Sequence, residues 1–241
     1  MKIATQKILT LLLITTLFSS CALDMFNRVN GNRNVVTEDR STKEDFTKIK
    51  VSTGLKLYIS QGSKNKIIVE ADENLQDLII TEVEDGVLKI YSEKNIWRSK
   101  ARKIYVTIEG LEAIAATSGS DVYTNTTLKV NDLNISATSG ANINISVEAN
   151  TVETNATSGS NIEISGISSN HISKATSGAS IDAYQLISTN VTAKVTSGAD
   201  INVHASESIF AKATSGGDID FKGSPKKVDK KTSSGGSISA Q

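Results

Sequence analysis

The sequence is poor in several residue types. Its 241 residues include one cysteine, one proline and two histidines, and aromatic residues make up only 5% of it. A single cysteine cannot form a disulfide within the chain. Basic and acidic residues balance at 26 each, without the basic excess of a general nucleic-acid binder, so we expect no nucleic-acid partner. No apolar run approaches the roughly 18 residues that span a bilayer as a helix, and 38% hydrophobic residues predict a folded body in water.

The first residues have the pattern of an export signal. Lys2 and Lys7 precede an apolar run over residues 8–18, which is too short to cross a hydrocarbon core of about 30 Å. Ser19-Ser20-Cys21 follows and resembles a bacterial lipobox, in which the chain is cut before the cysteine and the new terminus is lipidated. Phe18 departs from that pattern, which usually has leucine there. An ordinary signal peptide followed by an incidental cysteine is the alternative.

Short β-rich runs begin near residue 46, after a polar stretch over residues 22–40 that lacks periodicity and is expected to be a tether or a capping strand. Turns rich in glycine, asparagine and charged residues separate the runs, and most of them alternate between apolar and polar positions. They cover residues 49–51, 55–59, 67–69, 78–80, 87–91 and 104–108. Only residues 72–78 permit a helical turn. The chain is therefore expected to be all-β.

An internal repeat is the strongest signal in the sequence. A Ser-Gly pair followed by Ile or Val three residues after the glycine recurs along the second half. The successive glycines are 21, 19, 19, 20, 18 and 19 residues apart, at Gly119, Gly140, Gly159, Gly178, Gly198, Gly216 and Gly235. Units this short cannot each bury a core, so they must stack on one another.

Apolar positions alternate on both sides of each Ser-Gly pair. This pattern predicts a right-handed parallel β-helix, a solenoid with coils of about 19 residues and inward-facing columns such as Ile143, Ile162, Ile181, Ile201 and Ile219. Glycine would allow a positive φ at the bend, and the preceding serine is expected to form an interior hydroxyl ladder. Gly54 and Gly86 resemble looser versions of the same turn, in coils that carry insertions. A leucine-rich repeat is excluded because leucine is scarce and no helical arm is present.

These signals together give a domain plan. We predict a signal peptide over residues 1–20, a lipidated N-terminal tether over 21–40 with Cys21 as the lipidation site, and a single β-helix domain over 41–241. Within that domain, looser and irregular β coils over 41–115 precede regular Ser-Gly repeats over 116–241. The chain would then be lipid-anchored in the bacterial cell envelope, with the outer membrane as the expected site.

A filled solenoid interior leaves no room for a ligand, so binding is expected on the outer faces. Alternation places one outward polar column on the arm that follows each Ser-Gly pair, with Asn142, Asn161, Asp200 and Asp218 as candidate ligand-binding residues. Repeated carboxylates and amides would read a glycan chain or hold Ca²⁺, or they would only keep the face soluble and favour turns. We predict no metal site and no cofactor.

Two basic features complete the candidate site. A lysine stands four residues before each late glycine, at Lys174, Lys194, Lys212 and Lys231. Stacked lysines on successive coils would repel one another by roughly 1 kcal/mol per pair in water. These lysines would either splay into solvent beside nearby acids or bind an anionic polysaccharide or lipid headgroup.

Trp97, Arg98 and Lys100 lie in a second basic cluster over residues 94–103, which holds the only tryptophan. The indole would stack on a sugar ring beside basic side chains. Alternatively, Trp97 would pack inward and cap the end of the coil stack.

Three segments and the repeats resemble a known family. The segments are Gly31-Asn32-Arg33-Asn34-Val35-Val36, Phe46-Thr47-Lys48-Ile49-Lys50-Val51 and Glu84-Asp85-Gly86-Val87-Leu88-Lys89-Ile90. With the Ser-Gly coils, they resemble the putative auto-transporter adhesin head GIN domain family from about Val35 to the C-terminus. The resemblance implies a bacterial envelope protein with a β-helical body and an adhesive role, and it brings no catalytic residues with it.

The sequence therefore favours a non-catalytic, adhesin-like binding module that presents a stacked polar face to a surface glycan or an envelope protein. A polysaccharide-active lyase or hydrolase is an alternative, with Asp200, Asp218, Asp220, Lys194 and Lys212 as its cluster, but uniform short coils offer no long loops to wall a cleft. A ligand-free structural spacer is a second alternative. The oligomeric state is left open.

Overall fold

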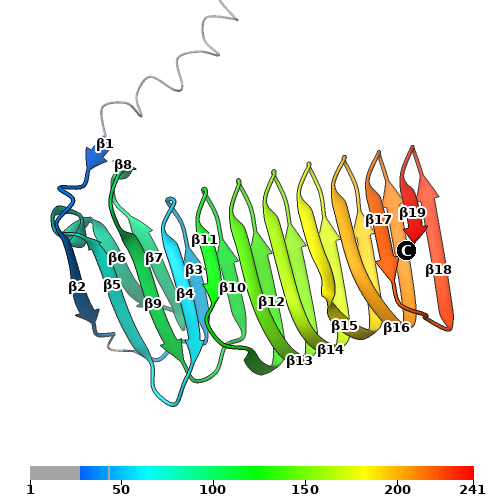
Figure 1. Cartoon of the computed structure of the whole chain (residues 1–241), viewed down its shortest axis with the longest axis horizontal. Helices are drawn as coiled ribbons and strands as arrows, with labels where there is room; N and C mark the ends of the chain where they lie inside the picture. Colours follow the sequence, from blue (N-terminus) through cyan, green and yellow to red (C-terminus); the bar gives the residue numbers. More distant parts are fainter. Residues whose placement is uncertain (1–27, 43) are drawn as a thin grey trace, which may run out of the picture.

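The computed structural model describes residues 28–42 and 44–241, which form a β-solenoid of about 7 turns. Coils stack side by side along the long axis of the molecule, and a row of tight turns runs along one edge of the stack (Figure 1). Cys21 and the predicted signal peptide lie outside the described residues. No helix in the described part of the chain is long and apolar enough to cross a membrane.

The elements form an irregular N-terminal part and a regular C-terminal part. The first part contains β1 (Arg28–Asn30), β2 (Val35–Arg40), β3 (Lys48–Val51), β4 (Lys56–Gln61), β5 (Lys66–Asp72), the 3-10 helix η3 (Glu73–Leu78), β6 (Ile79–Glu84), β7 (Val87–Ser92), β8 (Asn95–Arg98), β9 (Arg102–Ile108), β10 (Ala113–Ala116) and β11 (Asp121–Thr124). The second contains β12 (Leu128–Ala137), β13 (Asn142–Ala156), β14 (Asn161–Ala175), β15 (Ser180–Val195), β16 (Asp200–Thr214), β17 (Asp218–Lys222), β18 (Lys227–Ser233) and β19 (Ser237–Ala240).

Each regular coil is one long strand that bends in the middle. The arm after the Ser-Gly turn pairs in parallel with the same arm of the next coil, and so does the arm before the turn. The first set of arms forms what we call the post-turn sheet, and the second set forms the pre-turn sheet. Alternate side chains of both sheets point into a shared core, as the period of two in the sequence predicts.

Inward isoleucines form the predicted column. Ile162 pairs with Ile143 on one side and with Ile181 on the other, and the column continues through Ile201 to Ile219. Each of these five side chains is at most 1% exposed. The spacings of 20 and 18 residues do not disturb this column, because register shifts near the mid-strand bend absorb the difference.

The Ser-Gly pairs differ from the prediction in one respect. Both residues have positive φ, 51° to 58° for serine and 64° to 77° for glycine, which is the geometry of a type I′ turn. The serine side chains are exposed, so the predicted interior hydroxyl ladder is wrong. The inward position belongs to the residue after glycine, such as Ser160, whose hydroxyl donates to the Ala137 carbonyl at 2.8 Å.

Stacked turns hold this uncommon conformation. The glycine N–H of every Ser-Gly turn except the last, at Gly235, donates to the serine carbonyl of the next coil, for example from Gly140 to Ser158 at 3.2 Å. A Cβ atom at Gly119, Gly140 or Gly159 would meet no atom within 4 Å. Glycine is therefore required by its left-handed backbone and not by lack of space.

The N-terminal coils are stacked in an order that differs from the sequence. The end coil is built from β7 and β9, which pair with β3 and β4, and β10 and β11 pair with the other side of β3 and β4. The Thr53-Gly54 turn joins the row of turns, since Gly54 N–H donates to the Ser118 carbonyl at 3.0 Å. Asp85-Gly86 instead closes an antiparallel hairpin between β6 and β7, so the expectation of a coil turn at Gly86 is wrong.

Antiparallel strands close the N-terminal end. β5 pairs with β9, and β2 pairs with the outer side of β5. Residues 35–40 thus belong to the folded body, so the tether predicted over 21–40 is wrong for these residues and the alternative of a capping strand is confirmed. At the other end, β18 and β19 each pair on one side only, and Lys230 lies 4.7 Å from the Phe221 ring over the end of the core.

One polar cluster lies inside the regular coils. His171 is 1% exposed, and its Nε2 lies 3.0 Å from the Thr154 hydroxyl, which also donates to the Ser173 hydroxyl at 3.1 Å. Its Nδ1 has no partner among the described residues. Burial lowers the pKa of His171 from 6.5 to about 4, so the ring is neutral in the folded protein near neutral pH.

The buried isoleucine column gives a first prediction. Ile162→Asp places an unpaired charge in the core and should lower the free energy of unfolding by more than about 3 kcal/mol. Asn161→Asp makes an acidic substitution at the adjacent, outward position and should change that free energy by less than about 1 kcal/mol. Urea unfolding of both variants measures the difference. Equal losses would contradict the register.

The buried histidine gives a second prediction. The unfolded chain binds a proton at His171 below about pH 6.5, whereas the folded chain does so only near pH 4, so acid should remove stability across that window. The loss should reach about 3 kcal/mol. In the stack Val152 and Val191 flank this residue, so His171→Val should fold and should not show this loss of stability in acid. Urea unfolding of both proteins from neutral pH to about pH 4 measures it, and parallel curves would contradict the assignment.

Candidate functional site

An in-register lysine column crosses the outer surface of the pre-turn sheet. Lys174 pairs with Lys194, Lys194 with Lys212, and Lys212 with Lys231, as the spacing in the sequence predicts. The same column begins on earlier coils with Ser136 and Asn155. Neighbouring coils lie about 4.8 Å apart, so the column concentrates positive charge along one line.

The four lysines have different surroundings. Lys174 donates to Glu153 at 2.9 Å, and this hydrogen bond holds the pKa of the Glu153 carboxyl below its ordinary value. Lys231 Nζ lies 3.9 Å from Asp229 and 5.2 Å from the Phe210 ring. Lys194 and Lys212 form no ion pair with any carboxylate in the described ranges. Their charges are therefore available to a ligand.

A shallow groove runs beside this column. Its volume is about 540 Å³, and it is lined by Ser136, Asn155, Ala156, Thr157, Lys174, Ala175, Thr176, Lys194, Val195, Thr196, Lys212 and Thr214. Lysines and, two residues further along each coil, threonines line it as two adjacent outward columns. Ammonium groups thus lie beside hydroxyl groups along several consecutive coils, and we call this the lysine groove.

Phe210 adds an aromatic ring that sequence reasoning missed. It lies outward and half-buried in β16, two residues before Lys212, and Thr192 and Ile172 occupy the matching outward positions on the two preceding coils. The period-two pattern contained the signal, because a residue two positions from an outward lysine is itself outward. The lysine groove is therefore flanked by a partly apolar column.

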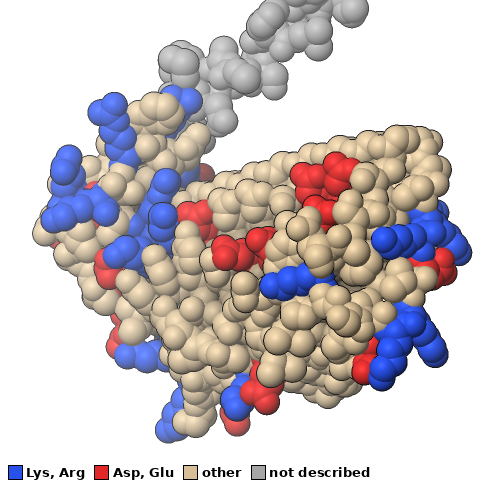
Figure 2. All heavy atoms as spheres, turned by 45° about the vertical axis from the view of Figure 1, so that its right-hand side comes forward, with Lys and Arg blue, Asp and Glu red and all other residues tan. Residues whose placement is uncertain are grey.

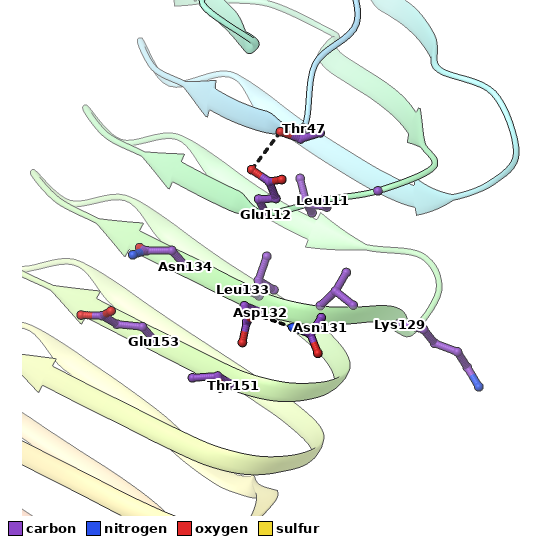
Figure 3. A pocket seen from close by; sticks show the side chains of 12 residues that line it. Thr47, Leu111, Glu112, Lys129, Asn131, Asp132, Leu133, Asn134, Thr151 and Glu153 are labelled. Atoms are coloured by element: carbon purple, nitrogen blue, oxygen red, sulfur yellow. Dashed lines mark hydrogen bonds between the residues drawn. The ribbon is translucent and has the colours of Figure 1, made fainter.

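An acidic groove lies further along the same sheet, towards the N-terminal end. It has a volume of about 710 Å³, and its lining includes Glu112, Asp132 and Glu153 on successive coils (Figure 3). Thr47 donates to Glu112 at 3.1 Å, and Asn131 donates to Asp132 at 2.6 Å. The Glu153–Lys174 ion pair therefore lies at the boundary between the acidic groove and the lysine groove.

The predicted polar column of the post-turn sheet lies outward as expected. Asn142, Asn161, Asp200 and Asp218 are all exposed. The Asn161 amide donates to Asn142 at 3.1 Å, and the Asn142 amide donates to Asp121 at 3.0 Å. These amides satisfy one another along the stack. The described residues contain no group of three His, Cys, Asp or Glu side chains arranged to hold a metal ion.

The two candidate faces do not meet. Asp200, Asp218 and Asp220 lie outward on the post-turn sheet, whereas Lys194 and Lys212 lie outward on the pre-turn sheet. The core separates the two sheets. The acid and lysine cluster that the enzyme alternative needs is therefore absent from the described part of the chain.

Trp97 lies far along the stack from the lysine groove, in the segment that replaces the Ser-Gly turn in the end coil. Its side chain is 54% exposed, and the guanidinium of Arg28 lies 4.2 Å from the centre of its ring. The alternative in which Trp97 packs inward is wrong, because Ile96 occupies the inward position at 5% exposure. Arg98 and Lys100 are exposed beside it.

Several solved bacterial structures have this fold. A putative adhesin from Bacteroides fragilis aligns with a TM-score of 0.82 at 23% identity, covering 88% of this chain and 100% of its own. A putative lipid binding protein from Parabacteroides distasonis gives 0.73 at 22% identity, covering 89% and 99%. A putative adhesin from Parabacteroides merdae gives 0.72 at 20% identity, covering 89% and 99%. At these identities the likeness shows the fold alone.

No curated protein matches the chain. The family described as putative auto-transporter adhesin, head GIN domain, matches residues 45–225, well over half of the sequence. This match agrees with the resemblance of the N-terminal segments and the Ser-Gly coils, and with the solenoid that they build. The chain belongs to the putative auto-transporter adhesin, head GIN domain, family.

Proposed function

We propose that the protein is an envelope-anchored, non-catalytic adhesin-like module that binds an acidic polysaccharide in the lysine groove. The observation that carries this proposal is the in-register pair Lys194 and Lys212, which has no acidic partner among the described residues and lines a groove of about 540 Å³. The family's name and the names of two of the three structural relatives are those of putative adhesins, and the third is that of a putative lipid binding protein, which supports a binding role at the cell envelope.

The chemistry of the groove fits an extended polyanion. Stacked ammonium groups repel one another, and a ligand that carries regularly spaced carboxylate or sulfate groups would relieve that repulsion. Threonine hydroxyls in the adjacent column can donate to and accept from sugar hydroxyls. The half-buried ring of Phe210 adds apolar surface beside the lysines.

The same observations disfavour catalysis. General acid and base groups must lie within hydrogen-bond reach of one substrate, and the acids and lysines named for the enzyme alternative lie on opposite sheets. Repeated coils supply repeated contacts instead, and each adds a similar increment of binding. A long ligand should therefore bind more tightly than a short one.

The lysine groove gives a third prediction. Lys194→Glu combined with Lys212→Glu should weaken binding to alginate, polygalacturonate or heparin at least tenfold and reduce its dependence on salt. Arg98→Glu combined with Lys100→Glu makes the same change of charge outside the groove and should leave binding within about twofold. Calorimetry at two salt concentrations measures both effects, with far-UV circular dichroism to check the fold.

Several results would contradict this assignment. Loss of binding in the Arg98 and Lys100 variant alone would assign the polysaccharide to the Trp97 cluster. Binding that survives in both variants would assign it to the Asn142, Asn161 and Asp200 face. Lack of binding to any of the three probes by the unmodified chain would favour a protein ligand or a ligand-free spacer.

We further propose that Cys21 is lipidated and holds the module at the envelope, with the outer membrane as the expected site. This proposal rests on the apolar run before Ser19-Ser20-Cys21 and on the absence of any other cysteine in the chain. Two or more acyl chains on one residue hold a protein stably at a bilayer, whereas a single chain does not.

The lipid anchor gives a fourth prediction. Cys21→Ser should move the protein from the detergent-extracted membrane fraction to the soluble fraction, and the far-UV spectrum should not change, since the substitution leaves every residue of the described solenoid in place. Fractionation of cells that express each form, followed by immunoblotting, measures the shift. A serine variant that still requires detergent for release would contradict lipidation at this residue.

A further inference from the structure

We infer that the Trp97 cluster is a membrane-docking patch that binds the anionic surface of a phospholipid bilayer. The patch comprises Arg28, Lys94, Trp97, Arg98 and Lys100. It goes beyond the proposed glycan site, because it lies on a different part of the fold. It rests on the proposed lipid anchor only for the argument from chain length given below.

The patch projects from the solenoid as a separate small sheet. β8 pairs in parallel with β1, and these two strands form a two-stranded sheet apart from the large one. They lie at the N-terminal end of the molecule, beside the row of turns (Figure 1). The other coils carry a Ser-Gly or Thr-Gly turn at this place, whereas the end coil carries residues 93–101. The insertion therefore presents Trp97 and its charged side chains to solvent, while Ile96 faces the core.

The patch combines an exposed indole with unpaired cations. Trp97 is 54% exposed, the largest exposure of a large aromatic side chain among the described residues. Arg28, Lys94, Arg98 and Lys100 are all exposed, and none forms an ion pair in the described part of the chain. Figure 2 shows Lys and Arg side chains gathered at this end of the molecule.

This composition matches the interface between a bilayer and water. Tryptophan partitions to the headgroup region, where one side of its ring meets apolar groups and its N–H stays hydrated. Lysine and arginine are attracted to the negative surface of anionic lipids. A sugar would also accept the indole, but Arg28 against the ring and three more exposed cations in the same segment favour a densely anionic surface over a single sugar.

The patch is held rigidly before any ligand binds. The buried carboxylate of Asp72 accepts hydrogen bonds from the backbone N–H groups of Arg33 at 2.9 Å, Lys100 at 3.0 Å and Ala101 at 2.9 Å. Gly31 N–H donates to the Arg98 carbonyl at 2.7 Å. These bonds fix both segments against the end coil, so docking would order little additional backbone.

The chain length places this patch near the proposed anchor. Six residues lie between Cys21 and Arg28, and the seven residue steps that join the two span at most about 25 Å when extended. A lipidated Cys21 would hold the patch within that distance of the bilayer and so raise its effective concentration there. An acyl anchor and a basic patch together would then bind the membrane as two signals.

A vesicle experiment tests the patch without the anchor. A chain that begins at Ala22 keeps every described residue and lacks the lipidation site. It should sediment with vesicles of phosphatidylcholine and phosphatidylglycerol in equal parts at least tenfold more than with phosphatidylcholine alone, and added salt should reduce the difference. Trp97 is the only tryptophan, so its emission should shift to shorter wavelength on binding.

Matched variants separate the patch from general charge. Arg98→Glu with Lys100→Glu should reduce vesicle binding at least tenfold, and Trp97→Ala should reduce it severalfold. Lys194→Glu with Lys212→Glu makes the same change of charge in the lysine groove and should retain vesicle binding. Far-UV circular dichroism should be the same for all variants, because the substituted side chains are exposed.

Three outcomes would overturn the inference. Equal loss of binding in both charge variants would mean that overall charge, and not the patch, attracts the vesicles. A shift of Trp97 emission with alginate but not with vesicles would assign the patch to a glycan. Vesicle binding without any change in Trp97 emission would place the contact elsewhere. A failure of the lysine groove or of Cys21 lipidation would leave these measurements unchanged, so the two proposals fail separately.

Discussion

The register in which each coil pairs with the next determines every other property of this solenoid. Because side chains alternate between the two faces of a strand, a slip of one residue would move Ile162 to the surface and Asn161 into the core. Parallel pairing in register brings Ile143, Ile162 and Ile181 into one continuous column. The Ser-Gly turns then align as well, and their backbone hydrogen bonds hold serine in a left-handed conformation that an isolated turn would disfavour.

The same register creates the charged grooves. A lysine four residues before each late glycine becomes a column only because the coils stack in register, and the glutamate at 153 becomes the partner of Lys174 for the same reason. Stability and binding are therefore opposed on this face. The ammonium groups of Lys194 and Lys212 repel each other in the free protein, and both would attract a bound polyanion.

The two ends of the stack differ in how they close. Antiparallel β2 and β5 cover the N-terminal end, where Asp72 fixes the Trp97 segment, whereas β18 and β19 each leave one edge unpaired. Lys89 of the end coil and Lys212 of a late coil occupy the same position in their strands. Seven coil spacings separate them, a distance of about 34 Å. A bilayer at the N-terminal end would leave the lysine groove well clear of the lipid surface.

Sequence alone determined the all-β class, the repeat of about 19 residues, the inward isoleucines and the outward columns, because each follows from local alternation and spacing. It also located Lys174, Lys194 and Lys212. Tertiary structure decided which columns share a face: Asp200 and Lys194 are six residues apart, yet the turn between them places them on opposite sheets. It also decided that the end coil is made from β7 and β9, because these strands pair with β3 and β4. It decided that Trp97 points outward, because β8 pairs with β1. Such long-range pairings leave no local pattern in the sequence.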